Sequence, residues 1–163
     1  MIAQGNLARA RHRSYALLGR LFREGITRQL LPTLELIDRL AVLLPEHFNE
    51  DDAAASHYHL FGFNVFAYEA IFLGSSEDQT PAQLGGETTY GVEQFYRRVG
   101  YITDATDLSV DHIAYEFGLL AHLAAAEADA WDDQQDNQAR QMQQHQAVFL
   151  SGHLLRWLPA VSE

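Results

Sequence analysis

The residues with the clearest capacity for chemistry lie in one short segment, 107–116, whose sequence is DLSVDHIAYE. Residues four apart share a helix face, and this segment has two such pairs, His112 with Glu116 and Asp111 with Tyr115. It lies within residues 101–136, which hold nine acids and no Arg. Carboxylates that converge there can accept the paired N–H groups of a guanidinium. The segment therefore favours binding of a cationic peptide; the simpler alternative is a capped helix start with a local His–Glu contact.

Patterns typical of catalysis and of metal binding are missing from the sequence. It contains no Cys, which excludes thiol nucleophiles and Cys-ligated metal sites. No His has a Glu three residues before it and no two His stand four apart, so helical di-iron and zincin spacings are absent. The phosphate-binding P-loop needs a Lys, and the sequence has none. We therefore expect no catalytic residue, no metal and no cofactor.

Charge and composition narrow the class of partner. The 163 residues include 22 acids and 11 Arg, for a net charge of -11, and seven of the Arg lie in residues 1–40. An acidic chain repels phosphate backbones, so nucleic acid is disfavoured and a cationic partner is favoured. No apolar run approaches membrane-spanning length and the N-terminal residues lack the features of a secretory signal. We expect a cytoplasmic protein that does not insert into a membrane.

The spacing of hydrophobic residues indicates that the secondary-structure elements that position these residues are helices. The spacing predicts an all-α fold, a multi-helix bundle in a single domain, residues 1–163. The expected landmarks, in chain order, are a helix containing 14–22, a helix over 30–44 closed by Pro45, a helix capped by Asn49, a loop then a helix in 60–73, a flexible loop at about 74–88, a helix stopped by Gly100, a long helix capped by Ser109, and a last helix that stops at Pro159.

Four stretches of sequence carry a resemblance to a known family. In order they are YALLGRLF at 15–22, YHLF at 58–61 leading to VFAYEAIF at 65–72, DH at 111–112 opening a long apolar helix, and FLSGHLLRWLP at 149–159. Together they resemble the TorD/DmsD/NarJ family of chaperones that mature molybdenum-cofactor oxidoreductases. Val110, Ala67 and Ala70 differ from residues that are frequent in that family.

The resemblance implies a cytoplasmic, non-enzymatic chaperone of the TorD-like helical type. Such a chaperone binds the twin-arginine signal peptide, or another segment, of a molybdoenzyme catalytic subunit and holds that subunit until its cofactor is inserted. Family members are monomers or helix-swapped homodimers, and the 74–88 loop is a plausible hinge. The residues expected to bind the client are Asp111, His112, Glu116, Tyr115, Tyr68, Glu69 and Phe66.

Two alternatives to a chaperone stay open at this stage. A non-catalytic structural subunit of a helical protein complex is the second choice, and it would show a broad apolar patch. A small helical metalloenzyme is the third, and the absent Glu-x-x-His spacing counts against it. The aromatic residues Phe66 and Tyr68 have an alternative of their own, because aromatics at helical spacing are more often part of the core.

Overall fold

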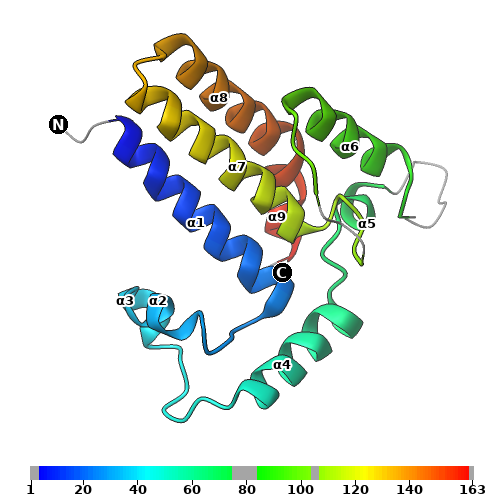
Figure 1. Ribbon diagram of the computed structural model, residues 1–163. Coiled ribbons are helices and arrows are strands. Elements are labelled where there is room, and N and C mark those ends of the chain that lie inside the picture. Colours follow the sequence, from blue (N-terminus) through cyan, green and yellow to red (C-terminus); the bar gives the residue numbers. More distant parts are fainter. Residues whose placement is uncertain (1–3, 75–83, 104–106, 162–163) are drawn as a thin grey trace. The chain divides into compact units, whose positions relative to one another are not determined.

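The computed structural model describes residues 4–74, 84–103 and 107–161, and within these ranges it confirms an all-α protein with no strand (Figure 1). Helices and two π-helical turns, η1 and η2, follow one another along the chain: α1 (Gln4–Glu24), α2 (Leu31–Glu35), α3 (Asp38–Ala41), α4 (Glu50–His59), η1 (Leu60–Asn64), α5 (Glu69–Leu73), α6 (Glu87–Val99), α7 (Ile113–Asp132), α8 (Asp136–Phe149), η2 (Leu150–Leu154) and α9 (Leu155–Val161). None of the described helices is long and apolar enough to cross a membrane.

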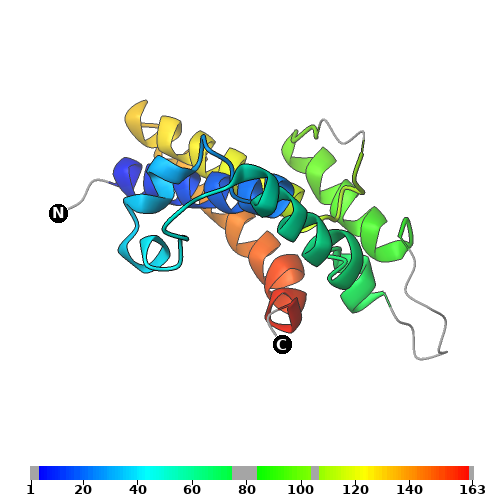
Figure 2. The ribbon, with the colours of Figure 1, turned by 90° about the horizontal axis from the view of Figure 1, so that it is seen from below.

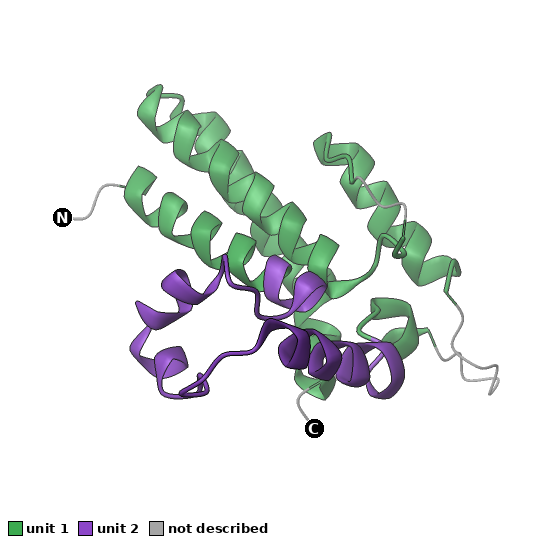
Figure 3. Ribbon diagram, turned by 60° about the horizontal axis from the view of Figure 1, so that its bottom comes forward, with its two compact units in different colours: residues 1–19, 67–163 green, residues 20–66 purple. Residues whose placement is uncertain are grey.

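The chain divides into two compact units (Figure 3). The first unit comprises residues 1–19 and 67–163, and the second comprises residues 20–66. The boundary falls inside α1, so the first sixteen residues of that helix belong to the first unit. That both units form one folding domain stays a prediction. All candidate site residues except Phe66 belong to the first unit.

Helix α7 is the centre of the first unit. Its side chains are buried on nearly every face, including the predicted stripe Ile113, Phe117, Leu120 and Ala124. Helix α8 lies beside it and runs in the opposite direction (Figures 1 and 2). Helix α1 is also antiparallel to α7, as shown by successive contacts that pair Arg9 with Asp132, Arg11 with Glu127, and Tyr15 with Phe117.

Small residues, rather than large apolar ones, let α1 approach α7. In the first unit, the buried residues of α1 are Gly5, Ala8 and Gly19. A Cβ atom added at Gly19 would stand 3.1 Å from the carbonyl oxygen of Ala114, closer than a side chain tolerates without a shift. The hydrophobic spacing of 14–22 therefore predicted the helix correctly, but the buried residues of α1 are small ones.

Several predicted helix ends are confirmed. Asn49 precedes α4, and its side-chain oxygen accepts hydrogen bonds from the backbone N–H groups of Asp51 and Asp52. Gly100 ends α6 in the left-handed conformation, at φ 72°, which glycine adopts without strain. The predicted loop at 74–88 falls largely on residues 75–83, which lie outside the described residues, and α6 already begins at Glu87.

Two other predicted helices have different bounds in the structure. The segment 30–44 is not one helix, because Ile37 is extended and separates α2 from α3. Ile37, which belongs to the predicted helical spacing, is 37% exposed, whereas Leu34 is buried. The last helix does not stop at Pro159, which lies inside α9. Proline costs one backbone hydrogen bond, but its fixed φ suits a helix, and Trp157, two residues earlier, is fully buried and holds α9 against the core.

Candidate functional site

The start of α7 differs from the sequence prediction. The N-cap is His112, whose Nδ1 accepts a hydrogen bond of 3.2 Å from the backbone N–H of Ala114. Ser109 lies outside the helix, and its hydroxyl donates to the carboxylate of Asp111. The prediction that Ser109 caps the helix, with Asp111 in the first turn, is therefore wrong by three residues. An imidazole cap requires a neutral Nδ1 acceptor, which sequence spacing alone does not indicate.

Asp111 is fully buried and joins two distant segments. Its backbone carbonyl accepts from the N–H of Glu69 at 3.0 Å, and its Oδ2 accepts from the N–H of Ala70 at 3.0 Å. The N–H of Ile113 donates to the carbonyl of Ala67 at 2.9 Å, which completes a short antiparallel bridge. Asp111 therefore supplies the N-terminal acceptor that α5 lacks in its own sequence, because Tyr68, the N-cap residue of α5, makes no side-chain cap.

Two further acids, Glu69 and Glu116, are buried beside this bridge. Nδ1 of His153 hydrogen-bonds both oxygens of Glu69, at 3.0 and 3.1 Å. Oε2 of Glu116 accepts a hydrogen bond of 3.3 Å from Nε1 of Trp157. Its other oxygen is buried and accepts no hydrogen bond from the described residues. The two acids link α5 and α7 to η2 and α9, so residues far apart in sequence form one buried polar cluster.

Burial raises the pKa of Glu116 well above its usual range, and repulsion from Glu69 and Asp111 raises that pKa further. A hydrogen bond with Glu69 acts in the same direction, because a protonated Glu116 can donate to the Glu69 carboxylate. Protonation also lets the Glu116 oxygen that accepts no hydrogen bond act as a donor, so it needs no donor from the protein. The cluster therefore favours the protonated form of Glu116.

This assignment predicts a pH dependence of stability. A pKa that is higher in the folded than in the unfolded protein gives stability that is complete below the ordinary glutamate pKa of 4.5 and is lost as pH rises through the folded pKa. Glu116→Gln keeps the donor and cannot ionise. Between pH 4.5 and the folded pKa, wild type should lose up to about 1.4 kcal/mol per pH unit relative to the variant, measured by urea unfolding. Glu93→Gln, at an exposed ion pair, is the control. Parallel curves for wild type and Glu116→Gln would contradict the assignment.

The structure brings most of the predicted site residues together, but buries them. Asp111 and Glu116 have no exposed surface, Glu69 has 2% and His112 has 6%. The ring of Tyr68 lies 4.8 Å from that of His112 and is only partly buried. Tyr115 is buried, with its hydroxyl donating to Asp107. Phe66 belongs to the second unit and is half exposed. Among these residues, Tyr68 and Phe66 are the ones that are not buried.

Sequence reasoning missed a fourth buried acid, Glu127. Its carboxylate accepts four hydrogen bonds, from Arg11 at 2.6 Å, Gln143 at 2.7 Å, Gln146 at 2.8 Å and Trp131 at 3.1 Å. Burial acts to raise its pKa, but the hydrogen bonds, with that from Arg11 the strongest, lower the pKa below the usual range. Glu127 is therefore an ionised acid that joins α1, α7 and α8. The four-residue step to Trp131 was the one local signal in the sequence.

The described residues contain no group of three or more His, Cys, Asp or Glu side chains placed to hold a metal ion. The clusters at Glu116 and Glu127 use their polar atoms for internal hydrogen bonds between helices. Fold and polar clusters thus define a helical protein in which the buried acids join helices together.

Comparison with known families assigns this helical protein to one of them. The family model described as "Nitrate reductase delta subunit" matches residues 29–163, most of the sequence. The protein belongs to the nitrate reductase delta subunit family. Membership implies a chaperone for maturation of a molybdoenzyme, with a nitrate reductase-type subunit as its partner. Searches of curated proteins and of solved structures returned no match.

Proposed function

We propose that this protein is a non-catalytic, cytoplasmic chaperone that binds the twin-arginine signal peptide, or another segment, of a molybdoenzyme catalytic subunit. It holds that subunit until its cofactor has been inserted, before export or assembly. The observation that carries this proposal is the family match over residues 29–163, which gives the class of client. The surface chemistry described below supports a client segment that is both cationic and apolar.

Exposed apolar side chains are concentrated in the second unit. Tyr58 is 65% exposed and Phe63 is 62% exposed, and their rings are in contact with centroids 5.1 Å apart. The other large exposed apolar side chains of residues 20–66 are Leu36, Ile37, Val42, Leu43, Leu60 and Phe66. Exposed apolar groups at this density are typical of a surface that binds another chain. They suit the apolar core of a signal peptide.

Acidic groups accompany these apolar side chains on the same helix. Asp51 and Asp52 are exposed in the first turn of α4, and Tyr58 is near its C-terminal end. At 1.5 Å per residue, the two ends are about 10 Å apart. A peptide with an Arg pair followed by an apolar stretch matches this order of chemical groups, since guanidinium groups pair with carboxylates and apolar side chains with aromatic rings.

The buried acids have a different part in the proposal. Asp111, His112, Tyr115, Glu116 and Glu69 position the segment around Tyr68 by holding α5 against α7, while Tyr68 and Phe66 contact the client. Burial raises the pKa of Tyr68, and the charges of Asp111 and Asp107 add to this, so its phenol stays protonated and can donate to a peptide carbonyl. This division of roles replaces direct pairing of Asp111 with a client Arg, because Asp111 has no exposed surface.

Calorimetric titration with signal peptides tests the proposal. Peptides from molybdoenzyme catalytic subunits should bind with a Kd of about 1 μM or tighter, and Arg-Arg→Ala-Ala versions should bind at least about tenfold more weakly. Raising the salt concentration should weaken binding, because exposed charge contacts are screened. In the protein, Tyr68→Ala should weaken binding, whereas Tyr90→Ala, at an exposed Tyr of the first unit, should not.

Failure of every signal peptide to bind would overturn recognition of the twin-arginine segment. Peptides that tile the mature catalytic subunit then test the second form of the proposal. Binding that is equal for the Arg-Arg and Ala-Ala peptides would show that the acidic surface is not used. A protein that is stable only within a permanent complex would support the structural-subunit alternative instead.

A further inference from the structure

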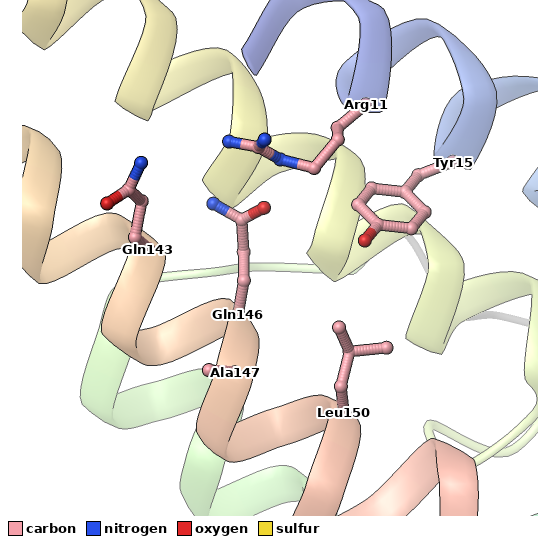
Figure 4. A pocket seen from close by; sticks show the side chains of 6 residues that line it. All are labelled: Arg11, Tyr15, Gln143, Gln146, Ala147 and Leu150. Atoms are coloured by element: carbon pink, nitrogen blue, oxygen red, sulfur yellow. The ribbon is translucent and has the colours of Figure 1, made fainter. Parts of the chain in front are cut away.

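A pocket of about 230 Å³ lies between α1 and α8, and its lining residues are different from those of the Asp111 cluster (Figure 4). All of its lining residues belong to the first unit: Arg11, Tyr15, Gln143, Gln146, Ala147 and Leu150. Arg11 and Tyr15 reach toward α8 from α1, and Gln146 lies between them and Ala147. The buried carboxylate of Glu127 fixes two sides of this pocket, because it binds both Arg11 and the two Gln side chains.

The amide of Gln146 is oriented by these bonds. Gln146 is 4% exposed, and its Nε2 donates to Glu127 at 2.8 Å and to the carbonyl of Met142 at 3.2 Å. Both N–H groups are thereby used, and the amide oxygen is on the Tyr15 side in Figure 4. Within the described part of the chain, no donor to this oxygen is present. The pocket therefore contains a fixed acceptor that has no protein partner there.

Donors and apolar walls complete the pocket. Burial raises the pKa of Tyr15, while Arg11 lowers and Glu127 raises it, and the net result is a phenol that stays protonated. Arg11 uses one nitrogen for Glu127 and has further N–H groups. Its charge is balanced by Glu127, so a charged ligand gains little: an anion competes with Glu127 and a cation meets Arg11. Ala147 and Leu150 supply the apolar part of the lining.

We infer that this pocket binds one uncharged, apolar side chain of a peptide segment together with the adjoining backbone amide. A cavity of 150 Å³ can hold benzene, whereas sites for complete small ligands begin at about 300 Å³. A pocket of 230 Å³ suits a side chain of the size of leucine. The peptide N–H donates to the Gln146 oxygen, and the peptide carbonyl accepts from Tyr15 or Arg11. The inference rests on the proposed function in one respect, that the segment belongs to the client.

The test uses N-acetyl-leucine methylamide as the probe and the full-length protein labelled with ¹⁵N. Titration should shift the side-chain amide resonances of Gln143 and Gln146 and saturate in about the millimolar range, the affinity expected for a fragment of this size. N-acetyl-glycine methylamide, which lacks the side chain, should bind at least about tenfold more weakly. Ala147→Trp fills the pocket and should abolish the shifts. Val148→Trp is the matched control, since Val148 is exposed on α8 but does not line the pocket.

The outcomes separate this inference from the proposed function. No saturable shift in wild type, or an equal shift in Ala147→Trp, overturns the pocket inference. If client peptides bind wild type and Ala147→Trp equally, the proposed function stands and the pocket is not its site. If the leucine probe binds but no client peptide does, the pocket inference stands as a peptide site and the proposed function fails. If client peptides bind Ala147→Trp about tenfold more weakly than wild type, and bind Val148→Trp as tightly as wild type, both the pocket inference and the proposed function are supported.

Discussion

Replacing Trp157 by alanine should lower the free energy of unfolding by about 3–5 kcal/mol, the usual cost of removing a buried tryptophan side chain. Trp157 is fully buried and stacks on Phe72 with ring centroids 5.3 Å apart. Its indole N–H is the donor to Glu116. The variant would therefore lose both the apolar contact that holds α9 against α5 and one hydrogen bond of the buried acid cluster. Equilibrium unfolding in urea or by heat measures the change.

Two further variants separate these contributions. Trp157→Phe keeps an aromatic ring but no donor, so it should cost less than Trp157→Ala and should alter the pH dependence that Glu116 causes. Arg156→Ala is the matched control, because Arg156 is the exposed neighbour on the same helix. A loss below about 1 kcal/mol for Trp157→Ala would show that α9 contributes little to the core of the first unit.

Glu127→Ala should have the second large effect, a loss of about 3 kcal/mol, at the lower end of the range for a broken buried ion pair. The four donors that meet at Glu127 would lose their common acceptor. The loss is at the lower end because Arg11 is 37% exposed and can turn toward water. The donors come from α1, α7 and α8, so the variant weakens the contact among all three helices. Chemical unfolding of the variant and wild type measures the difference.

Two control variants test whether the effect of Glu127→Ala depends on the charge of Glu127 and on its buried position. Glu127→Gln keeps the size but loses the ion pair, and should be less destabilising than Glu127→Ala. Glu93→Ala removes an exposed ion pair with Arg97 and should cost less than about 1 kcal/mol. Because the folded pKa of Glu127 is lowered, its stabilisation is complete above the ordinary pKa of 4.5 and is lost as pH falls through the folded pKa. If Glu127→Gln lost as much stability as wild type when the pH falls below 4.5, this assignment would be contradicted.

The two buried glutamates of α7 thus titrate in opposite directions for identifiable reasons. Glu116 lies beside other acids and has an indole as its hydrogen-bond donor, so the proton is retained. Glu127 has a guanidinium, an indole and two amides, so the charge is retained. Both residues belong to the acidic stretch at 101–136, which the sequence presents as one uniform feature. Their partners come from other helices, and local spacing does not give these partners.

Apart from Phe66, the residues predicted as a site lie near one another, but most of them are buried, which the sequence did not predict. Asp111, His112 and Glu116 were grouped because they are neighbours in sequence, and Tyr68 and Glu69 because of the family resemblance; the structure brings both groups together. Sequence spacing gave no sign that Asp111 caps α5, because that bond joins residues 41 apart. Their roles in client binding stay proposals, and the partly exposed Tyr68 and the half-exposed Phe66 are the members of the set that keep accessible surface.

Local interactions explain what the sequence determined by itself. The all-α class, the cap at Asn49, the stop at Gly100 and the acidic charge balance each depend on residues within a few positions or on composition. Tertiary structure alone decided which acids are buried, which of them keep a proton, and where the pocket lies. These properties depend on contacts such as Arg11 with Glu127, 116 residues apart, because burial and pairing change a carboxyl group's energy far more than its sequence neighbours do.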